Sequence, residues 1–398
     1  MLIRRARNGR LYLALTAALV VACGGATPAT TPSGSLATGS PSPALSSAAS
    51  PKAIAPTPGE TVPATRVPDP SPTDAPTGSG SPAAAPGWSE LDVTGDAPAA
   101  VEDHTWTIDS SGSAAYLFGG RAGGQESDEL WRYDLADDSW TRLDVAGSRP
   151  AARFGHVAVW VDEIGLVVWS GQAGSRFFTD IWAYDPDAGS WQELAANGDV
   201  PAPRYGSCGA IGPDGRLWIS HGFTEDEGRF SDTRAYDFSS GTWEDMTPGG
   251  RVPVERCLHD CLWTPDGRFL LYAGQTTGVP AIGDVWTYQP TDASWTAGAE
   301  PEPAPRQLYA LATVGANAYV FGGGSAEGRM LDDLWQLDLE QISWTKFDLA
   351  GPSPVGRAGA TLVSDPARSR LLLFGGATAK SELNDLWQLS LVPPDGND

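Results

Sequence analysis

The chain has 398 residues, 16 tryptophans and an apolar content of 41%, which is enough to bury at least one large core. Its formal net charge is −23, and nearly all of the acidic residues lie after position 86. Because nucleic-acid binding needs a basic face, this charge argues against a nucleic-acid partner.

The first 22 residues predict a secretory signal. Residues 1–22 begin with four arginines and continue into the apolar run LYLALTAALVVA, which is too short to span a bilayer. The run ends in VVAC, and small residues before a cysteine resemble the lipobox of bacterial lipoproteins. This resemblance implies cleavage before Cys23 and attachment of a lipid to that cysteine. The alternative is an ordinary signal peptide with a cysteine near its cleavage site.

The segment that follows predicts a tether. Residues 24–86 are almost all Ala, Pro, Ser, Thr and Gly, with no apolar periodicity. Such a segment cannot bury enough apolar surface to offset the chain entropy lost on folding. We therefore expect residues 23–86 to be a lipidated cysteine and a disordered tether, which anchors an extracytoplasmic domain to the membrane at the bacterial cell surface.

From residue 87 onward the sequence repeats with a period near 50 residues. Tryptophans recur at spacings of 52, 51, 52, 52 and 49 residues, at Trp88, Trp140, Trp191, Trp243, Trp295 and Trp344. Glycine-ended strands such as YLFGG (116–120) and aromatic strands such as LWRYDL (130–135) recur with them. Each unit contains an opening strand, a glycine-ended strand, an aromatic strand and a tryptophan strand. Six such units predict an all-β fold, a six-bladed β-propeller.

The glycine pair, the aromatic strand and the later tryptophan together resemble the kelch repeat, over residues 87–398. The resemblance implies a kelch-type propeller. Two features depart from the repeat. The first glycine of the pair is replaced by Ser170, His221 and Ala273, and Arg234 stands where an aromatic strand usually has tryptophan.

The C-terminal unit lacks one strand. The chain ends in LWQLSLVPPDGND, without the tryptophan strand that follows every other aromatic strand. One tryptophan strand, GWSELDV at 87–93, precedes all other elements of the repeat. We therefore expect residues 87–93 to complete the sixth blade and close the ring, because closure removes a free sheet edge.

Five arginines recur at one position of the repeat, in the loop that enters each blade. They are Arg153, Arg204, Arg256, Arg306 and Arg357, with Val101 at the matching place of the first blade. We expect these arginines to ring the mouth of the central channel, where forked guanidinium donors suit a carboxylate or sulfate. The alternative is that each arginine bonds backbone carbonyls of its neighbours.

Longer and more variable loops share the face that carries the arginines. Phe177, Phe178 and Phe230 lie in these loops, and we expect them to stack on a sugar or to grip a peptide. The alternative is that these rings pack between blades.

Three histidines stand at one repeat position, namely His104, His156 and His259, and Tyr309 falls at the same position. Imidazoles from neighbouring blades can converge on a metal ion, but similar repeats commonly place a histidine here for packing. We expect no metal and no cofactor.

The repeats contain an odd number of cysteines for a secreted domain, Cys208, Cys257 and Cys261. A disulfide from Cys208 to either of the other two is left open.

The fold does not by itself decide the function. The preferred interpretation is a cell-surface binding module that presents an arginine-lined channel mouth to an anionic protein, peptide or glycan, with no catalytic residues. The alternative is a carbohydrate-active propeller enzyme, similar to galactose oxidase or to a sialic-acid mutarotase. Galactose oxidase needs a cysteine crosslinked to a tyrosine, a second tyrosine and two histidines, and this sequence does not supply that set. A third interpretation is a structural role as an envelope spacer.

Overall fold

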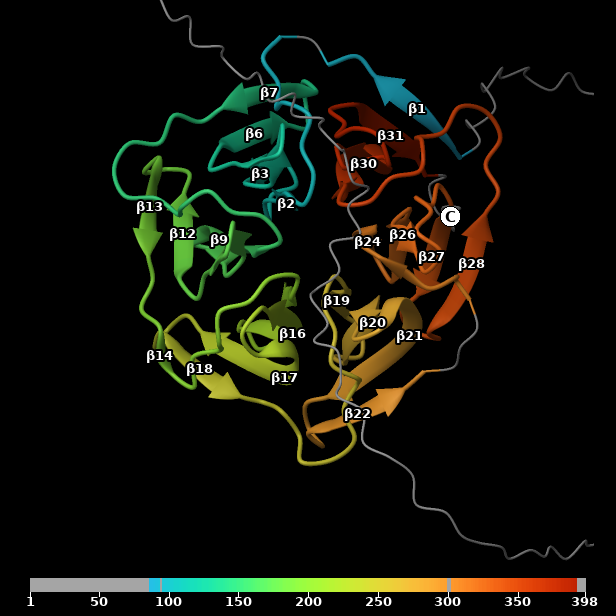
Figure 1. Cartoon of the computed structure of the whole chain (residues 1–398). Coiled ribbons are helices and arrows are strands. Elements are labelled where there is room, and N and C mark those ends of the chain that lie inside the picture. The colour runs from blue at the N-terminus through green and yellow to red at the C-terminus, as the bar shows by residue number, and fades with distance from the viewer. Residues whose placement is uncertain (1–85, 94, 299–301, 392–398) are drawn as a thin grey trace, which may run out of the picture. The chain divides into compact units, whose positions relative to one another are not determined.

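The computed structural model of the protein describes residues 86–93, 95–298 and 302–391 (Figure 1). The predicted signal, the Cys23 lipidation site and the tether lie outside the described residues. Within them the fold is all-β, with one short 3-10 helix, η1 (Pro366–Arg368). The predicted all-β class is confirmed.

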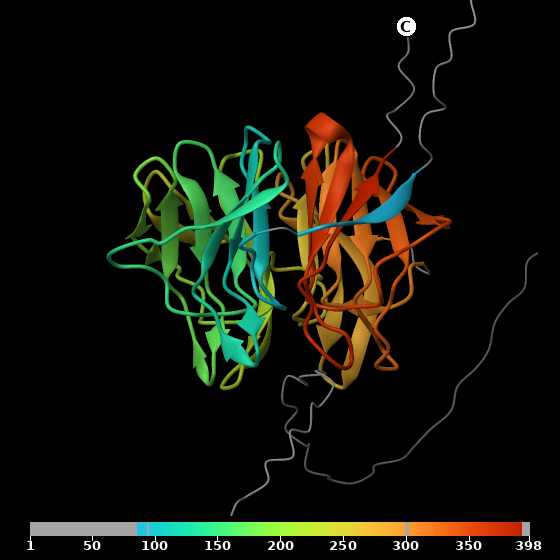
Figure 2. The same ribbon diagram turned by 90° about the horizontal axis from the view of Figure 1, so that it is seen from above.

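Six antiparallel sheets are arranged as blades around a central channel, and Figure 2 shows the same ring from the side. The first blade is β2 (Thr105–Ile108), β3 (Ala114–Phe118), β6 (Leu130–Asp134) and β7 (Ser139–Arg142). The second is β8 (Val157–Val161), β9 (Gly165–Trp169), β12 (Ile181–Asp185) and β13 (Ser190–Glu193). The third is β15 (Cys208–Ile211), β16 (Leu217–Thr224), β17 (Gly228–Asp237) and β18 (Thr242–Asp245), with β14 (Asn197–Gly198) beside β18.

The remaining three blades repeat this order. The fourth is β19 (Asp260–Trp263), β20 (Phe269–Thr276), β21 (Val279–Gln289) and β22 (Ser294–Ala297). The fifth is β24 (Ala310–Val314), β25 (Asn317–Phe321), β27 (Leu334–Asp338) and β28 (Ser343–Phe347). The sixth is β29 (Thr361–Asp365), β30 (Arg370–Phe374), β31 (Leu386–Ser390) and β1 (Gly87–Leu91). The predicted six-bladed propeller is confirmed.

Short strand pairs extend the loops between the second and third strands of the first two blades. They are β4 (Arg121–Ala122) with β5 (Gln125–Glu126), and β10 (Gln172–Ala173) with β11 (Arg176–Phe177). Near the fourth and fifth blades, β23 (Arg306–Gln307) pairs with both β21 and β26 (Gly324–Ser325).

The two ends of the domain meet in one sheet, as expected from the sequence. Strand β1 pairs antiparallel with β31 and places Trp88 opposite Leu389 (Figure 1). The Trp88 side chain is 5% exposed and meets Phe321 of the fifth blade edge-on, with ring centroids 5.3 Å apart. The N-terminal strand therefore completes the sixth blade and helps to bury its contact with the fifth.

The recurring tryptophans have a common packing partner. In five blades this residue contacts the aromatic side chain just before the glycine pair of the preceding blade. These contacts are Trp88–Phe321, Trp140–Phe374, Trp191–Phe118, Trp243–Trp169 and Trp344–Tyr272, with ring centroids 4.7–5.3 Å apart. The hydrophobic core is therefore divided into clusters between neighbouring blades, and the period of the sequence is the period of these clusters.

The glycine pair marks a backbone position that is left-handed in every blade. The first residue of the pair has φ between 58° and 68°, including Ser170, His221 and Ala273, which replace glycine there. The second position is always glycine, because a Cβ there would collide with the entering loop of the same blade, as Gly171 shows against His156. The substitutions at the first position therefore leave the backbone path unchanged.

Candidate functional site

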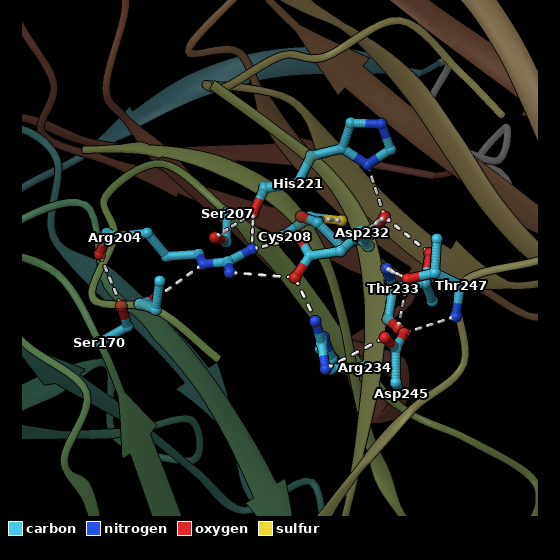
Figure 3. A network of polar contacts seen from close by, with 12 residues as sticks. Ser170, Arg204, Ser207, Cys208, His221, Asp232, Thr233, Arg234, Asp245 and Thr247 are labelled. Carbon is cyan, nitrogen blue, oxygen red and sulfur yellow. Dashed lines mark hydrogen bonds and ion pairs between the residues drawn. The ribbon is translucent and has the colours of Figure 1, made fainter. Parts of the chain in front are cut away.

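The position of the repeated arginine can be followed in the third blade. Arg204 is 1% exposed, and its guanidinium donates to both carboxylate oxygens of Asp232, from Nη1 at 2.6 Å and from Nη2 at 3.1 Å (Figure 3). Nη1 also donates to the carbonyl of His221 at 2.9 Å, and Nε donates to the carbonyl of Ala202 at 3.0 Å. The guanidinium thus joins the entering loop to the second and third strands of its own blade.

The other four arginines make the same contacts and are 0–1% exposed. Their two-pronged partners are Asp180 for Arg153, Asp284 for Arg256, Asp333 for Arg306 and Asp385 for Arg357. Burial opposes ionisation of these aspartates, but the hydrogen bonds and charge of the arginines hold each carboxyl pKa below its usual value. Each blade from the second to the sixth therefore contains a buried, satisfied ion pair.

A third side chain completes each pair and explains the departure at Arg234. In four blades an indole N–H donates to the aspartate, from Trp182, Trp286, Trp335 or Trp387, at 2.7–2.8 Å. In the third blade the Nε of Arg234 donates to Asp232 at 3.1 Å, so arginine takes over the role of the tryptophan donor (Figure 3). Arg234 also lies 3.3 Å from a carboxylate oxygen of Asp245.

Two of the three candidate phenylalanines lie against the buried ion pairs, and the third packs on another phenylalanine. Phe178 lies 4.0 Å from the Arg153 guanidinium carbon, measured to the ring centroid, and Phe230 lies 3.8 Å from that of Arg204. These rings cover the guanidinium faces and shield the pairs from solvent. Phe177 contacts Phe223 edge-on at 6.2 Å.

The structure therefore places seven of the eight candidate side chains at the buried ion pairs, while Phe177 is partly buried against Phe223 of the next blade. This differs from the expected ring of open arginine donors at the channel mouth, because every guanidinium is already bonded to an aspartate and to carbonyls. The bonding to neighbouring carbonyls, which the sequence analysis gave as the alternative, is what the geometry shows. Ligand binding by these residues stays a prediction.

Backbone atoms of the entering loops form a hydrogen-bonded ring at the arginine end of the channel. Six residues, one from each entering loop, form a closed ring in which every N–H donates to the carbonyl of the preceding blade, with N···O distances of 2.8–3.1 Å. They are Asp103, Gly155, Gly206, Leu258, Leu308 and Gly359, and all have φ between 52° and 65°. The sequence analysis missed this ring; the glycine two residues after three of the arginines was its only signal.

The inner strands below this backbone ring enclose a cavity of about 250 Å³, which we call the channel cavity. Histidines at its wall join neighbouring blades: His156 Nε2 lies 2.8 Å from Thr105 Oγ1, and His104 Nε2 lies 2.7 Å from Thr361 Oγ1. Burial lowers the pKa of His104 to about 3, so this imidazole is neutral at physiological pH. Among the described residues, no three histidine, cysteine or carboxylate side chains are placed to hold one metal ion.

Tyr309 has the same joining role in the fifth blade. Its hydroxyl donates to the carbonyl of Tyr272 at 2.7 Å and accepts from the N–H of Asp260 at 2.9 Å. At this repeat position His104, His156 and Tyr309 thus each bond a residue of the preceding blade.

The first blade departs from the pattern of buried ion pairs. Val101 replaces the arginine, and Arg121 instead contacts two carboxylates, Glu102 at 3.1 Å and Asp103 at 2.9 Å. Burial and the neighbouring Asp103 charge raise the pKa of Glu102 to about 7, against the opposing effect of Arg121. The Arg121 guanidinium is therefore the ion-pair partner of two buried carboxylates, at the place where the first blade meets the sixth.

A comparison with known families agrees with the geometry of the blades. The family model described as the KLHDC2/KLHL20/DRC7 Kelch-repeats domain matches residues 84–274 and 254–393, which is more than half of the chain. The chain belongs to the kelch-repeat family. The period, the glycine pairs and the tryptophan contacts described above are thus those of kelch blades.

Several curated proteins are similar to this kelch chain. Kelch domain-containing protein 2 of Bos taurus is 28% identical over 279 residues, which is 60% of this chain and 66% of that protein. Kelch domain-containing protein 1 of Mus musculus is 30% identical over 275 residues, 59% of this chain and 66% of that protein. Leucine-zipper-like transcriptional regulator 1 of Pongo abelii is 27% identical over 270 residues, 63% of this chain and 31% of that protein. The similarity therefore covers only part of each relative.

The kelch domain carries one disulfide. It joins Cys208 of β15 to Cys261 of β19, which are inner strands of the third and fourth blades, with Cα atoms 5.5 Å apart. Cys257 is buried and takes no part in this disulfide. Of the two pairings left open by the sequence, the structure has the one with Cys261. In the part of the chain that the structure describes, no helix has the length and apolarity needed to cross a bilayer.

Proposed function

We propose that this kelch propeller is a protein-binding module held outside the cytoplasmic membrane, and that it binds its partner through one end of the ring. We call this end the loop face and define it as the loops between the second and third strands of the blades. These segments are 119–129, 170–180, 221–232, 273–284, 322–333 and 375–385, and in the third and fourth blades they include the ends of β16, β17, β20 and β21.

Within each loop the base is constant and the tip varies. In five of the six the base contains the aspartate that pairs with the buried arginine, so the ends of those loops are fixed to the blade. The exposed tips have no common sequence: GGQ (123–125), GSR (174–176), EDE (225–227), TGVP (277–280), EGR (327–329) and AKS (379–381). A rigid base with six different tips is the arrangement by which a repeat scaffold acquires specificity for one partner.

The observation that carries the proposal is that three neighbouring pairs of these loops are bonded to one another. Glu382 of the sixth blade accepts from the N–H groups of Gly123 at 2.6 Å and Gly124 at 3.2 Å, and Glu126 accepts from the N–H of Gly174 at 2.9 Å. Arg229 Nη1 donates to Thr277 Oγ1 at 3.1 Å. Loops tied to one another lose less conformational entropy on binding, so the loop face is preorganised for a partner.

The charge of the tips suggests the chemistry of the partner. Arg329 and Lys380 are exposed and lie on adjacent blades, the fifth and the sixth, while Arg176 is exposed on the second. These basic tips, rather than the buried arginines of the repeat, are available to an acidic protein or peptide segment. The tip of the third blade, residues 225–227, is acidic and would meet a basic part of the same partner.

The placement outside the membrane rests on two features. The VVAC motif at residues 20–23 supports lipidation of Cys23, and the Cys208–Cys261 disulfide fits an oxidising compartment. Replacement of Cys23 by Ser should release the protein from the membrane fraction; if the variant stays there, the lipid anchor is not at this residue.

The binding face is tested by photo-crosslinking in cells that express the full chain. A photoreactive amino acid is placed at Arg329 or Lys380 on the loop face, or at Asp187 or Glu340 in hairpins at the opposite end. We expect one partner protein to crosslink from the loop face only, and its yield to fall in a chain carrying Arg176→Glu. Crosslinks that form only from Asp187 or Glu340, or from no position, would overturn the proposal.

A further inference from the structure

The third blade carries a short extra strand along its outer edge. This strand, β14, consists of Asn197 and Gly198 and pairs parallel with the outer strand β18 (Figure 1). The N–H of Asn197 donates to the carbonyl of Gly241 at 3.0 Å. The N–H of Asp199 donates to the carbonyl of Trp243 at 2.9 Å. Strand β14 therefore covers backbone groups of β18 that would otherwise form a free sheet edge.

The contacts of β14 account for both of its residues. Gly198 has a φ of 72°, and a Cβ at this residue would lie 2.5 Å from the carbonyl oxygen of Trp243. Glycine is the residue that tolerates both the left-handed conformation and so close an approach. The side chain of Asn197 donates from Nδ2 to the carbonyl of Gly241 at 3.2 Å. The packing of the edge therefore favours an Asn-Gly step, and both of its residues are exposed.

The backbone nitrogen of Gly198 is open to reaction. Successive N–H groups along a strand point to opposite sides, so the N–H of Gly198 points away from β18. Among the described residues, none accepts a hydrogen bond from it. This nitrogen can therefore lose its proton to a base in the solvent and attack Cγ of the Asn197 side chain. Because Gly198 has no Cβ, no side chain hinders the approach.

We propose that Asn197 is a modification site, at which the chain converts asparagine to isoaspartate and thereby releases β14 from β18. The Gly198 nitrogen forms a bond to Cγ of Asn197, and the Cγ–Nδ2 bond breaks. Nδ2 takes up a proton and leaves as ammonia, so that a five-membered succinimide remains. Water then opens this ring: attack at the main-chain carbonyl carbon gives isoaspartate, and attack at Cγ gives aspartate. The reaction consumes only water.

Isoaspartate ends the pairing of β14 for two reasons. Its main chain runs through Cγ and is longer by one carbon atom, so the N–H groups of residues 197 and 199 no longer face their two acceptors together. The donor Nδ2 is also lost, and the carboxylate that appears can only accept. The bond to the carbonyl of Gly241 therefore cannot form again.

The test is incubation of the full chain at pH 8 and 37 °C, followed by peptide mapping with mass spectrometry. Asn317 is the internal control, because the next residue, Ala318, is 0% exposed and lies within the paired strand β25. We expect conversion at Asn197 to be at least tenfold faster than at Asn317, with more isoaspartate than aspartate in the product. Equal or no conversion would overturn the proposal. A product that is aspartate alone would also overturn it, because direct hydrolysis of the amide gives aspartate only.

Two variants separate the reaction from its consequence. Asn197→Gln keeps the amide but would need a six-membered ring, so we expect it to convert at least tenfold more slowly than the wild type. Asn197→Asp carries the new charge on a main chain of normal length. In the converted chain, isolated by ion exchange, the amide hydrogen of Asp199 should exchange at least tenfold faster than in fresh Asn197→Asp. Exchange as slow as in the fresh wild type would show that β14 stays in place and would refute its release.

A measurement on the unaltered chain does not depend on the folding of any variant. Because the Gly198 nitrogen must lose its proton before it attacks, conversion at Asn197 should be at least tenfold slower at pH 5.5 than at pH 8. A rate that is the same at both pH values would contradict attack by this nitrogen.

Discussion

Arg204 and Asp232 lie 28 residues apart in the sequence and meet inside the third blade as a two-pronged ion pair. The arginine side chain is 1% exposed and the aspartate side chain 17% exposed. Since Nε and Nη1 also donate to the carbonyls of Ala202 and His221, this one side chain joins three segments of the blade. The pair belongs to the interior of the fold, and its loss should be felt in stability.

We predict that Arg256→Ala, at the same position of the fourth blade, lowers the free energy of unfolding by about 3–5 kcal/mol, because it leaves the largely buried Asp284 carboxylate without a cationic partner. Chemical denaturation measures the change. Arg329→Ala is the matched control: the residue is an exposed arginine of a loop tip, and its removal should change the stability by less than about 0.5 kcal/mol. Equal stability of the two variants would contradict the structural role of the buried pair.

The burial of the repeated arginines in ion pairs differs from the open ring of donors that the sequence analysis preferred. Spacing showed that they share one position, but it did not show whether that position is open or closed. The counter-charge was visible, because an aspartate stands two residues before the aromatic or Arg234 position in five units, as in Asp180 and Asp232. Pairing these two periodic signals, 27 or 28 residues apart, would have identified the ion pairs.

The closure of the ring gives a second prediction. Trp88→Ala should destabilise the propeller by about 3–5 kcal/mol, because a buried ring that packs on Phe321 is replaced by a cavity. Glu90→Ala lies in the same strand with its side chain exposed and should have little effect. Thermal and denaturant melts compare the two variants. If Trp88→Ala melts like the wild type, strand β1 is not needed to hold the sixth blade.

The strands and the closure of the ring could be predicted, because both follow from the period of the repeat and from the pattern of apolar residues within it. The tryptophan strand that contains Trp88 precedes all the blades, and β31 is the aromatic strand that no tryptophan strand follows in the sequence. Their pairing was therefore predictable. The backbone ring around the channel could not be predicted in the same way. Leu258 and Leu308 adopt a left-handed conformation that leucine rarely takes, and only the inter-blade hydrogen bonds of the folded state make it favourable.

The acidic pair of the first blade gives a prediction for pH dependence. The pKa of Glu102 is raised from 4.5 to about 7 in the folded state, so folding favours its protonated form. Its contribution to stability is therefore present below about pH 4.5 and is lost as the pH rises to about 7. We expect the denaturant midpoint of the wild type to fall between pH 5 and pH 8, and the fall to be smaller in Glu102→Gln.

The control for this measurement is Glu340→Gln, which removes the same charge from an exposed hairpin. Its pH profile should follow the wild type, because no buried partner is affected. A Glu102→Gln chain with an unchanged pH profile would show that the carboxyl is not held in its protonated form by the fold.

The disulfide supplies the last prediction. Cys208 and Cys261 close a loop with a sequence separation of 53 residues and tie the inner strands of the third and fourth blades. Removing this crosslink should lower the free energy of unfolding by about 2–4 kcal/mol, mainly because the unfolded chain gains freedom. The design uses Cys257→Ala as the reference: dithiothreitol should lower its melting temperature as in the wild type. In Cys208→Ala/Cys261→Ala the melting temperature should already be low and should not respond to the reductant. If the Cys257→Ala chain does not respond to the reductant, the crosslink in the folded protein involves Cys257 instead of the pair that the structure joins.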